Sequence, residues 1–282
     1  MTGSAPLTIA EVLRRSRDFL AERGSSSPRL DAELLLAHAL GVERLGLYTD
    51  SERPLTPPEL ERCRELIARR GRREPVAYLT GERAFRRLRL AVGPGVLVPR
   101  PETEVLVEWA LELLAPGAAV LDWGTGSGAI AIALATEGDG LRVTGVDDSP
   151  EALAVAEANA TAAGGDVELV RSDGFGALTG RAFDAVVANP PYLSEGDMDD
   201  APPELAFEPH RALVSGPTGL EAIAAIVRDA PAHLVAGGWL LMEVGAGQAP
   251  GVVAMLRDAG ASEASSRDDL AGIARAVGGR FG

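Results

Sequence analysis

The 282-residue chain is 46% hydrophobic and has a formal net charge of −14 at pH 7, which suits a globular protein long enough for two domains. It contains no signal-peptide core and no apolar run near the roughly 18 residues that span a bilayer, so we expect a cytoplasmic protein without membrane contact. The single cysteine, Cys63, excludes an internal disulfide, and three scattered histidines lack metal-ligand spacing, so no metal is expected.

The first part of the chain, residues 1–75, is predicted to form a small helical bundle. Thr8 and Glu11 form a capping-box pattern at the start of one apolar-periodic segment, and Thr56 and Glu59 form another. We therefore treat this region as a domain of its own.

Charge is unevenly distributed along the chain. Residues 1–100 contain 18 Arg against 13 Asp and Glu, a charge of +5, whereas residues 101–282 contain 9 Arg against 28 acids, a charge of −19. A basic part in an acidic chain can mark a partner-binding face, but arginines that solvate amphipathic helices explain it equally well.

After residue 75 the helical periodicity of the apolar residues gives way to other patterns. Residues 76–100 alternate apolar and polar side chains around a Gly-Pro-Gly turn, which predicts a β-hairpin connector. Residues 101–282 alternate strand-like and helix-like segments, which predicts an α/β domain with a mostly parallel sheet and helices on both faces.

A glycine-rich loop lies between a strand and a helix near the start of this α/β domain. The apolar residues 118–123 precede Gly124, Thr125, Gly126, Ser127 and Gly128, and residues 129–134 continue as a helix. Glycines allow close backbone approach, and the helix N-terminus offers unpaired N–H groups to an anion. The pattern predicts a site for a charged small molecule, but it fits NAD as well as S-adenosylmethionine.

An acid follows the next predicted strand. Asp147 ends residues 141–147, about 20 residues beyond the glycine loop, where an acid typically binds the two hydroxyls of a ribose. Asp147 could instead pair with the N-terminus of the next helix, but Ser149 and Pro150 already provide a cap and a first-turn proline. We therefore predict that Asp147 is a ribose ligand.

The most informative motif is Asn189-Pro190-Pro191-Tyr192, directly after the apolar residues 183–188. These residues predict a buried parallel strand, so the motif lies at the sheet edge where ligands bind in α/β proteins. The Asn189 side chain and the Pro190 carbonyl can accept both hydrogens of a planar NH2 group. This arrangement suits alkylation of an amide or an exocyclic amine, although an Asn-Pro turn that merely closes the strand has the same sequence.

Taken together, these motifs resemble a class I S-adenosylmethionine-dependent methyltransferase with a Rossmann-like domain. Other segments resemble the release-factor glutamine methyltransferases (PrmC/HemK family) and cover nearly the whole chain in the family's order. They are residues 29–35, 73–81, 98–104, 207–209 with Ala212 and Leu213, 243–245 with Gln248, and 267–272 with Arg275.

The resemblance implies methylation of the glutamine amide nitrogen in the Gly-Gly-Gln loop of class I peptide chain release factors, with residues 1–75 as the substrate-recognition domain. In this family the glycine loop surrounds the methionyl group, Asp147 binds the ribose, and Asp173 and Gly174 meet the adenine. Gly174 provides no side chain for stacking on the adenine. The resemblance assigns catalysis to Asn189, Pro190 and Tyr192, and substrate binding to the whole motif with Pro191; Asn189 also borders the cofactor.

Several other functions share part of this pattern. A glutamine methyltransferase that acts on a ribosomal protein would have the same catalytic motif. An N6-adenine or N4-cytosine methyltransferase would too, but the acidic α/β domain disfavours nucleic-acid binding. A dehydrogenase would explain the glycine loop and Asp147 but not Asn189, and a non-catalytic cofactor-binding protein would not require the motif.

Overall fold

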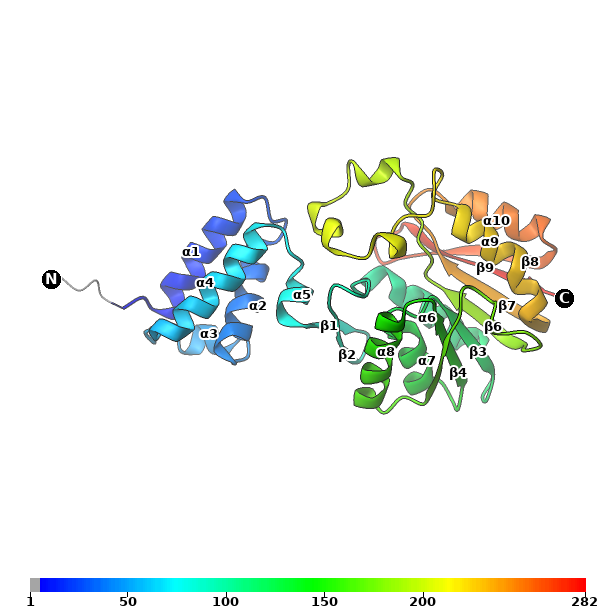
Figure 1. Cartoon of the computed structure of the whole chain (residues 1–282), viewed down its shortest axis with the longest axis horizontal. Coiled ribbons are helices and arrows are strands. Elements are labelled where there is room, and N and C mark those ends of the chain that lie inside the picture. The colour runs from blue at the N-terminus through cyan, green and yellow to red at the C-terminus, as the bar shows by residue number, and fades with distance from the viewer. Residues whose placement is uncertain (1–5) are drawn as a thin grey trace. The chain divides into compact units, whose positions relative to one another are not determined.

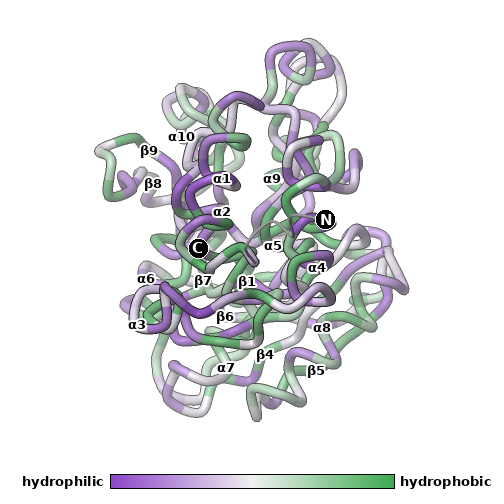
Figure 2. Tube along the Cα trace, turned by 90° about the vertical axis from the view of Figure 1, so that its left-hand side faces the viewer, coloured by the Kyte–Doolittle hydropathy of each residue, from purple (hydrophilic) through white to green (hydrophobic). Residues whose placement is uncertain are grey.

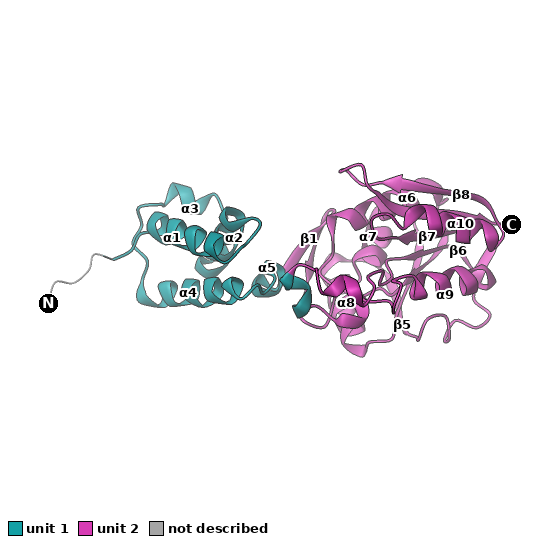
Figure 3. Cartoon of the chain, turned by 90° about the horizontal axis from the view of Figure 1, so that it is seen from above, with its two compact units in different colours: residues 1–81, 203–207 teal, residues 82–202, 208–282 magenta. Residues whose placement is uncertain are grey.

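A computed structural model describes residues 6–282 of the chain. Two compact units are distinguished by their internal contacts (Figure 3). One contains the described residues up to Gly81 together with Pro203–Phe207, and the other contains Glu82–Pro202 and Glu208–Gly282. We call them the helical unit and the sheet unit. The division of roles predicted for residues 1–75, 76–100 and 101–282 remains a prediction.

The helical unit is a bundle of amphipathic helices. Its helices are α1 (Ile9–Glu22), α2 (Pro28–Leu40), α3 (Gly46–Thr49), α4 (Pro57–Gly71) and α5 (Val76–Thr80). Both predicted capping boxes are present, at Thr8 with Glu11 and at Thr56 with Glu59. Hydrophobic and hydrophilic stretches alternate along these helices in Figure 2, and the apolar side chains, Cys63 among them, form one buried cluster.

A buried ion pair attaches a distant segment to this bundle. Arg70 of α4 is only 5% exposed, and its Nε donates to Asp31 Oδ2 of α2 at 2.7 Å. The Nη2 atoms of Arg70 and Arg73 lie 2.9 and 2.8 Å from Glu204 Oε1. Glu204 belongs to the 3-10 helix η3 (Pro203–Phe207), so these contacts explain why that segment belongs to the helical unit.

The sheet unit begins with a β-hairpin. Strands β1 (Glu82–Phe85) and β2 (Leu88–Ala91) pair antiparallel, and Arg86 adopts a positive φ of 50° in the turn. This turn lies at Arg86 and Arg87 and not at the predicted Gly-Pro-Gly turn, which follows β2 as irregular chain because residues 96–100 form no strand that could pair with β2. An irregular segment leads from β2 to η1 (Pro101–Thr103) and α6 (Glu104–Leu113).

A seven-stranded sheet forms the centre of the sheet unit within the described residues. In the order β5-β4-β3-β6-β7-β9-β8, the first five strands are parallel and β9 is antiparallel to both of its neighbours. The strands are β3 (Ala119–Trp123), β4 (Arg142–Asp147), β5 (Val167–Arg171), β6 (Phe183–Ala188), β7 (Leu234–Glu243), β8 (Ala261–Asp268) and β9 (Ala274–Phe281).

Helices cover both faces of this sheet, as predicted (Figure 1). One buried apolar cluster includes side chains of α6, α7 (Ala129–Glu137) and α8 (Pro150–Ala163); the other includes α9 (Glu221–Asp229) and α10 (Ala249–Asp258). Short 3-10 helices occur at η2 (Gly196–Met198), η4 (His210–Ala212) and η5 (Ala230–His233). None of the helices in residues 6–282 is long and apolar enough to cross a membrane.

The strand order determines where a ligand can bind. From β3 the chain adds β4 and then β5 on one side, and it then returns to add β6 on the other side of β3. The order of the strands therefore switches direction between β3 and β6. Open α/β sheets bind ligands beyond the carboxyl ends of the strands at such a switch point. The site is therefore expected beyond Trp123, Asp147 and Ala188, the last residues of these three strands.

Candidate active site

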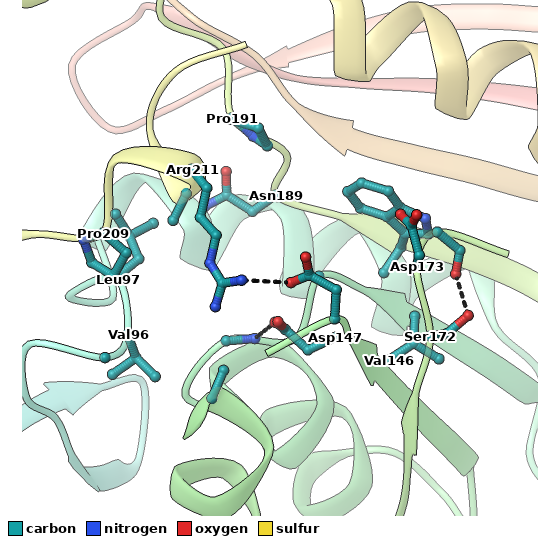
Figure 4. A pocket seen from close by; sticks show the side chains of 18 residues that line it. Val96, Leu97, Val146, Asp147, Ser172, Asp173, Asn189, Pro191, Pro209 and Arg211 are labelled. Carbon is teal, nitrogen blue, oxygen red and sulfur yellow. Dashed lines mark hydrogen bonds and ion pairs between the residues drawn. The ribbon is translucent and has the colours of Figure 1, made fainter. Parts of the chain in front are cut away.

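A pocket occupies this position in the sheet unit (Figure 4). Its floor and walls come from the ends of β3, β4, β5 and β6, from the segment after the hairpin, and from the segment around η4. The lining residues are Gly95, Val96, Leu97, Trp123, Gly124, Gly126, Val146, Asp147, Asp148, Ala152, Ser172, Asp173, Gly174, Asn189, Pro191, Pro209, Arg211 and Ala212.

The glycine loop forms part of the pocket through its backbone. Gly124, Gly126 and Gly128 have positive φ angles of 73°, 55° and 82°. A Cβ on Gly124 would meet no atom within 4 Å, so this face of the loop is open, whereas a Cβ on Gly128 would lie 2.8 Å from Ile132 Cδ1. Gly124 and Gly126 line the pocket; Thr125 and Ser127 are buried beside them and Gly128 is needed for helix packing.

Asp122 forms hydrogen bonds with the glycine loop and with the start of the helix that follows it. Its side chain is fully buried, and Oδ2 accepts hydrogen bonds from Thr125 Oγ1 at 2.6 Å and from the Ala131 N–H at 3.1 Å. Burial raises the pKa of this carboxyl to about 7, the two hydrogen bonds opposing that shift. Asp122 Oδ1 has no hydrogen-bond partner. Asp122 therefore orients the loop and does not line the pocket.

Asp147 lies at the carboxyl end of β4 and faces the pocket. Oδ2 accepts from the Gly126 N–H at 2.9 Å and Oδ1 accepts from the Ser149 N–H at 3.0 Å. Burial raises the pKa of the carboxyl, although both backbone bonds favour the ionised form. A carboxylate offers about four acceptor sites, so about two remain for a ligand with paired hydroxyls.

Another wall of the pocket contains Trp123 and the loop that follows β5. Asp173 and Gly174 lie in the loop after β5, where Ser172 Oγ donates to the Gly174 carbonyl at 2.8 Å. A Cβ on Gly174 would lie 3.8 Å from Trp123 Nε1, so the indole lies beside this glycine. Trp123 Nε1 is buried without a hydrogen-bond partner. The indole therefore supplies an aromatic surface next to the position where Gly174 has no side chain.

The Asn-Pro-Pro-Tyr motif follows β6 at the same edge. Asn189 and Pro191 line the pocket, but Pro190 and Tyr192 do not. Asn189 Nδ2 donates to Thr103 Oγ1 at 3.1 Å, and Tyr192 OH donates to Glu243 Oε1 at 3.2 Å. Burial raises the pKa of the Tyr192 phenol well above its usual value, so the hydroxyl stays protonated at neutral pH.

A backbone contact fixes the end of this motif. Gln248 Nε2 donates to the Tyr192 carbonyl at 2.9 Å, while its Oε1 accepts from the Gly245 N–H at 2.8 Å. A Cβ on Gly245 would lie 3.0 Å from Gln248 Oε1, so glycine is favoured there. The structure thus brings the glycine loop, Asp147, Asp173 and Asn189 together around one pocket.

These lining residues fit a nucleoside that carries a charged tail. The carboxylate of Asp147 keeps acceptor sites for ribose hydroxyls, the open face of Gly124 leaves room beside the backbone, and Trp123 offers a surface for a base. Within residues 6–282, no group of three or more His, Cys, Asp or Glu side chains has the arrangement of a metal site.

Comparison with known proteins identifies the family. The model of the PrmC N-terminal domain matches residues 11–81, and that of the methyltransferase small domain matches residues 101–216. The release factor glutamine methyltransferase of Geobacter sulfurreducens is 45% identical over 98% of this chain and 97% of its own length. The chain belongs to the release factor glutamine methyltransferase family. The family member of Burkholderia pseudomallei is 44% identical over 99% of this chain and 98% of its own length.

A solved structure supports the fold assignment of this family member. A methyltransferase from Pyrococcus furiosus superposes with a TM-score of 0.54 at 19% identity, over 71% of this chain and 91% of its own. This similarity concerns the fold alone. The family and the Rossmann-like methyltransferase fold predicted from the motifs are both confirmed.

The pocket of this release factor glutamine methyltransferase also contains residues that sequence reasoning did not assign to it. Val96 and Leu97 belong to the predicted connector yet form a wall of the pocket. Buried Glu208 holds this wall, because Oε2 accepts from the Val98 N–H at 2.9 Å and Oε1 from Arg100 Nη2 at 2.5 Å. The Glu-Pro pair after Phe207 was the available sequence signal.

An exposed ion pair lies among the residues that line the pocket. Arg211 Nη1 lies 3.1 Å from Asp148 Oδ1, and both side chains are more than half exposed (Figure 4). The pair joins the segment around η4 to the residue after β4. Its exposure indicates a weak interaction.

Proposed function

We propose that this protein transfers a methyl group from S-adenosylmethionine to the side-chain amide nitrogen of the glutamine in the Gly-Gly-Gln loop of class I peptide chain release factors. The observation that carries the proposal is the position of Asn189 and Asp147 on one pocket, at the carboxyl ends of β6 and β4, the two strands that flank β3. The names of the curated relatives support the choice of substrate. A reaction on a translation factor takes place in the cytoplasm, and it requires neither a metal nor direct nucleic-acid binding.

The cofactor would supply an electrophilic methyl group on its sulfonium sulfur. We assign its ribose to the free acceptor sites of Asp147 and its methionyl group to the glycine loop, residues 124–128. The adenine would lie between the loop at Asp173 and Gly174 and the apolar wall that contains Val96 and Leu97. Trp123 would take the place of an aromatic side chain at position 174.

The substrate amide poses a problem of orientation, because its nitrogen lone pair is delocalised into the carbonyl. Asn189 Oδ1 and the Pro190 carbonyl would accept one N–H each and turn the nitrogen toward the methyl group. The same acceptors stabilise the positive charge that develops on nitrogen as the new bond forms. Holding the two reactants near attack distance lowers the barrier further. Ideal orientation can lower a barrier by about 7–11 kcal/mol, and we expect this site to reach roughly the lower end of that range.

The remaining residues of the motif support this geometry. Pro191 lines the pocket and Tyr192 packs behind it with its hydroxyl on Glu243. The prolines hold the acceptors in place, because each pyrrolidine ring fixes the backbone φ angle. Tyr192 shapes the substrate side through its ring.

The experiment that tests the proposal is transfer of labelled methyl from S-adenosylmethionine to a purified, unmethylated release factor, followed by mass-spectrometric mapping. We expect label on the glutamine of the Gly-Gly-Gln loop and none on a Gln→Ala substrate. Label on a ribosomal protein or on nucleic acid, with none on the release factor, would refute the substrate assignment. Tight cofactor binding without any methyl transfer would refute the enzymatic function.

A further inference from the structure

Behind the pocket, a buried threonine connects Asn189 to a carboxyl group. Thr103 is 3% exposed and Glu243 is 1% exposed. Asn189 Nδ2 donates to Thr103 Oγ1 at 3.1 Å, and Thr103 Oγ1 donates to Glu243 Oε2 at 2.5 Å. The three side chains come from η1, the end of β6 and the end of β7, so only the folded sheet edge brings them together.

The direction of these hydrogen bonds follows from the chemistry of the groups. A hydroxyl has a single proton, and an ionised carboxylate can only accept. When Glu243 is ionised, Thr103 must donate its proton to the carboxylate and can offer Asn189 only a lone pair. The Asn189 NH2 group therefore faces Thr103, and its Oδ1 is left to accept a hydrogen bond from a ligand in the pocket that Asn189 lines.

We propose that Glu243, acting through the hydroxyl of Thr103, is a positioning residue that fixes the orientation of the Asn189 side-chain amide. The proposal rests on the function proposed above, in which Asn189 Oδ1 accepts a hydrogen from the substrate amide. An amide turned by 180° would present its NH2 group to the substrate NH2 group, and two donors cannot form a hydrogen bond. Thr103 and Glu243 would act on the reaction without touching the reactants.

The surroundings of Glu243 connect this arrangement to pH. Besides Thr103, the Tyr192 hydroxyl donates to the carboxyl, Arg275 of β9 attracts it, and Glu102 of η1 repels it. Burial raises the pKa of Glu243 to about 7. A protonated Glu243 can donate to Thr103, which frees the threonine proton to approach Asn189 Oδ1. Both orientations of the amide then become available, and the rate should fall as the pH decreases through this pKa.

The test uses variants that change one property of the connection at a time. Thr103→Val keeps the shape but removes the hydroxyl, Thr103→Ser keeps the hydroxyl, and Glu243→Gln supplies an NH2 donor to Thr103. At saturating cofactor, we expect kcat for methylation of the release factor to fall by about tenfold or more in Thr103→Val and Glu243→Gln, as for loss of a preorganised polar group. Thr103→Ser should recover most of this loss, and the Kd of the cofactor should stay unchanged in all three.

Elsewhere in the sheet unit, a similar connection provides matched controls. Arg181 Nη2 donates to Thr144 Oγ1 at 2.9 Å, and Thr144 Oγ1 donates to Glu168 Oε2 at 3.0 Å. Neither Thr144 nor Glu168 lines the pocket. Thr144→Val and Glu168→Gln therefore make the same chemical changes outside the site and should leave kcat unchanged.

The pH profile separates positioning from loss of structure. The wild-type kcat should decrease as the pH falls through about 7, and this inflection should be absent in Glu243→Gln. A Thr103→Val variant with kcat near the wild-type value would overturn the proposal, as would a Thr103→Ser variant as impaired as Thr103→Val. So would a pH inflection that persists unchanged in Glu243→Gln.

A measurement without substrate distinguishes failure of this proposal from failure of the proposed function. The side-chain NH2 signals of Asn189 in an amide NMR spectrum, identified by their loss in Asn189→Asp, report the hydrogen bond to Thr103. We expect a shifted, slowly exchanging proton in the wild type and in Thr103→Ser, and its loss in Thr103→Val. An inactive wild type with this signature would refute the substrate, whereas an active wild type without it would refute the positioning role.

Discussion

Replacing Asp147 by Asn should weaken binding of S-adenosylmethionine while leaving the fold intact. In the wild type, each carboxylate oxygen already accepts one backbone N–H, from Gly126 at 2.9 Å and from Ser149 at 3.0 Å. About two acceptor sites remain for the two ribose hydroxyls. Asparagine keeps only one carbonyl oxygen and turns an NH2 group toward one of the two backbone donors.

The magnitude follows from the number of hydrogen bonds lost. A hydrogen bond to a charged group contributes about 1.5–3 kcal/mol, and the variant loses at least one such bond to the ribose. We therefore expect the Kd to rise about 10- to 150-fold. The protein should also unfold at a slightly lower temperature, because the glycine loop loses part of its support.

Isothermal titration calorimetry with S-adenosylhomocysteine, the demethylated product, would measure this change without turnover. Asp139→Asn is a matched control, because Asp139 is exposed and does not line the pocket. With an analogue that lacks both ribose hydroxyls, wild type and Asp147→Asn should bind almost equally. An unchanged Kd for S-adenosylhomocysteine in Asp147→Asn would refute the ribose assignment, and so would an equal loss with the analogue.

Three further changes test other parts of the site. Asn189→Ala should abolish turnover while cofactor binding largely survives, and normal kcat in this variant would contradict the mechanism. Arg211→Ala should raise the cofactor Kd by at most about fivefold, because an exposed ion pair contributes about 0–1 kcal/mol, and the effect should disappear in high salt; a loss above tenfold would show that Arg211 has another role. Burial raises the pKa of Asp122 from 3.8 to about 7, so the native state keeps a proton that the unfolded chain releases in this range. The free energy of unfolding should therefore fall as the pH rises from about 4 to about 7, and urea titrations of Asp122→Asn should show a flatter dependence.

Local patterns predicted much of this structure. Asn189, the glycine loop from Gly124 and the acid at Asp147 each lie at the carboxyl end of an apolar strand, and parallel strands bring these ends to the same edge of the sheet. The capping boxes at Thr8 and Thr56 also predicted helix starts correctly. These features depend on residues close together in the sequence, which is why they can be read from it.

The contacts that complete the site could not be read in this way. Asn159 of α8 accepts from the Ala91 N–H at 2.7 Å and donates to the Ser127 carbonyl at 2.9 Å, thus joining the hairpin to the glycine loop. Glu208 reaches Val98 across 110 residues of sequence. Single polar side chains that pair over such separations leave no periodic pattern. For the same reason, the hydrogen bond between Thr103 and Glu243 could not be predicted. Both residues lie in segments that resemble the family, but the resemblance gave neither of them a role.

The segment Pro203–Phe207 has a consequence for how this protein can be divided. Its flanking residues belong to the sheet unit while it belongs to the helical unit, so the chain passes from one unit to the other at residues 81–82, 202–203 and 207–208. A truncation that removes the first 81 residues would leave Glu204 without Arg70 and Arg73. The loop that follows the Asn-Pro-Pro-Tyr motif would then lose these two ion pairs at its middle. The two units therefore cannot be exchanged separately between relatives. A chimaera that takes the helical unit from one relative has to take the segment Pro203–Phe207 from the same relative.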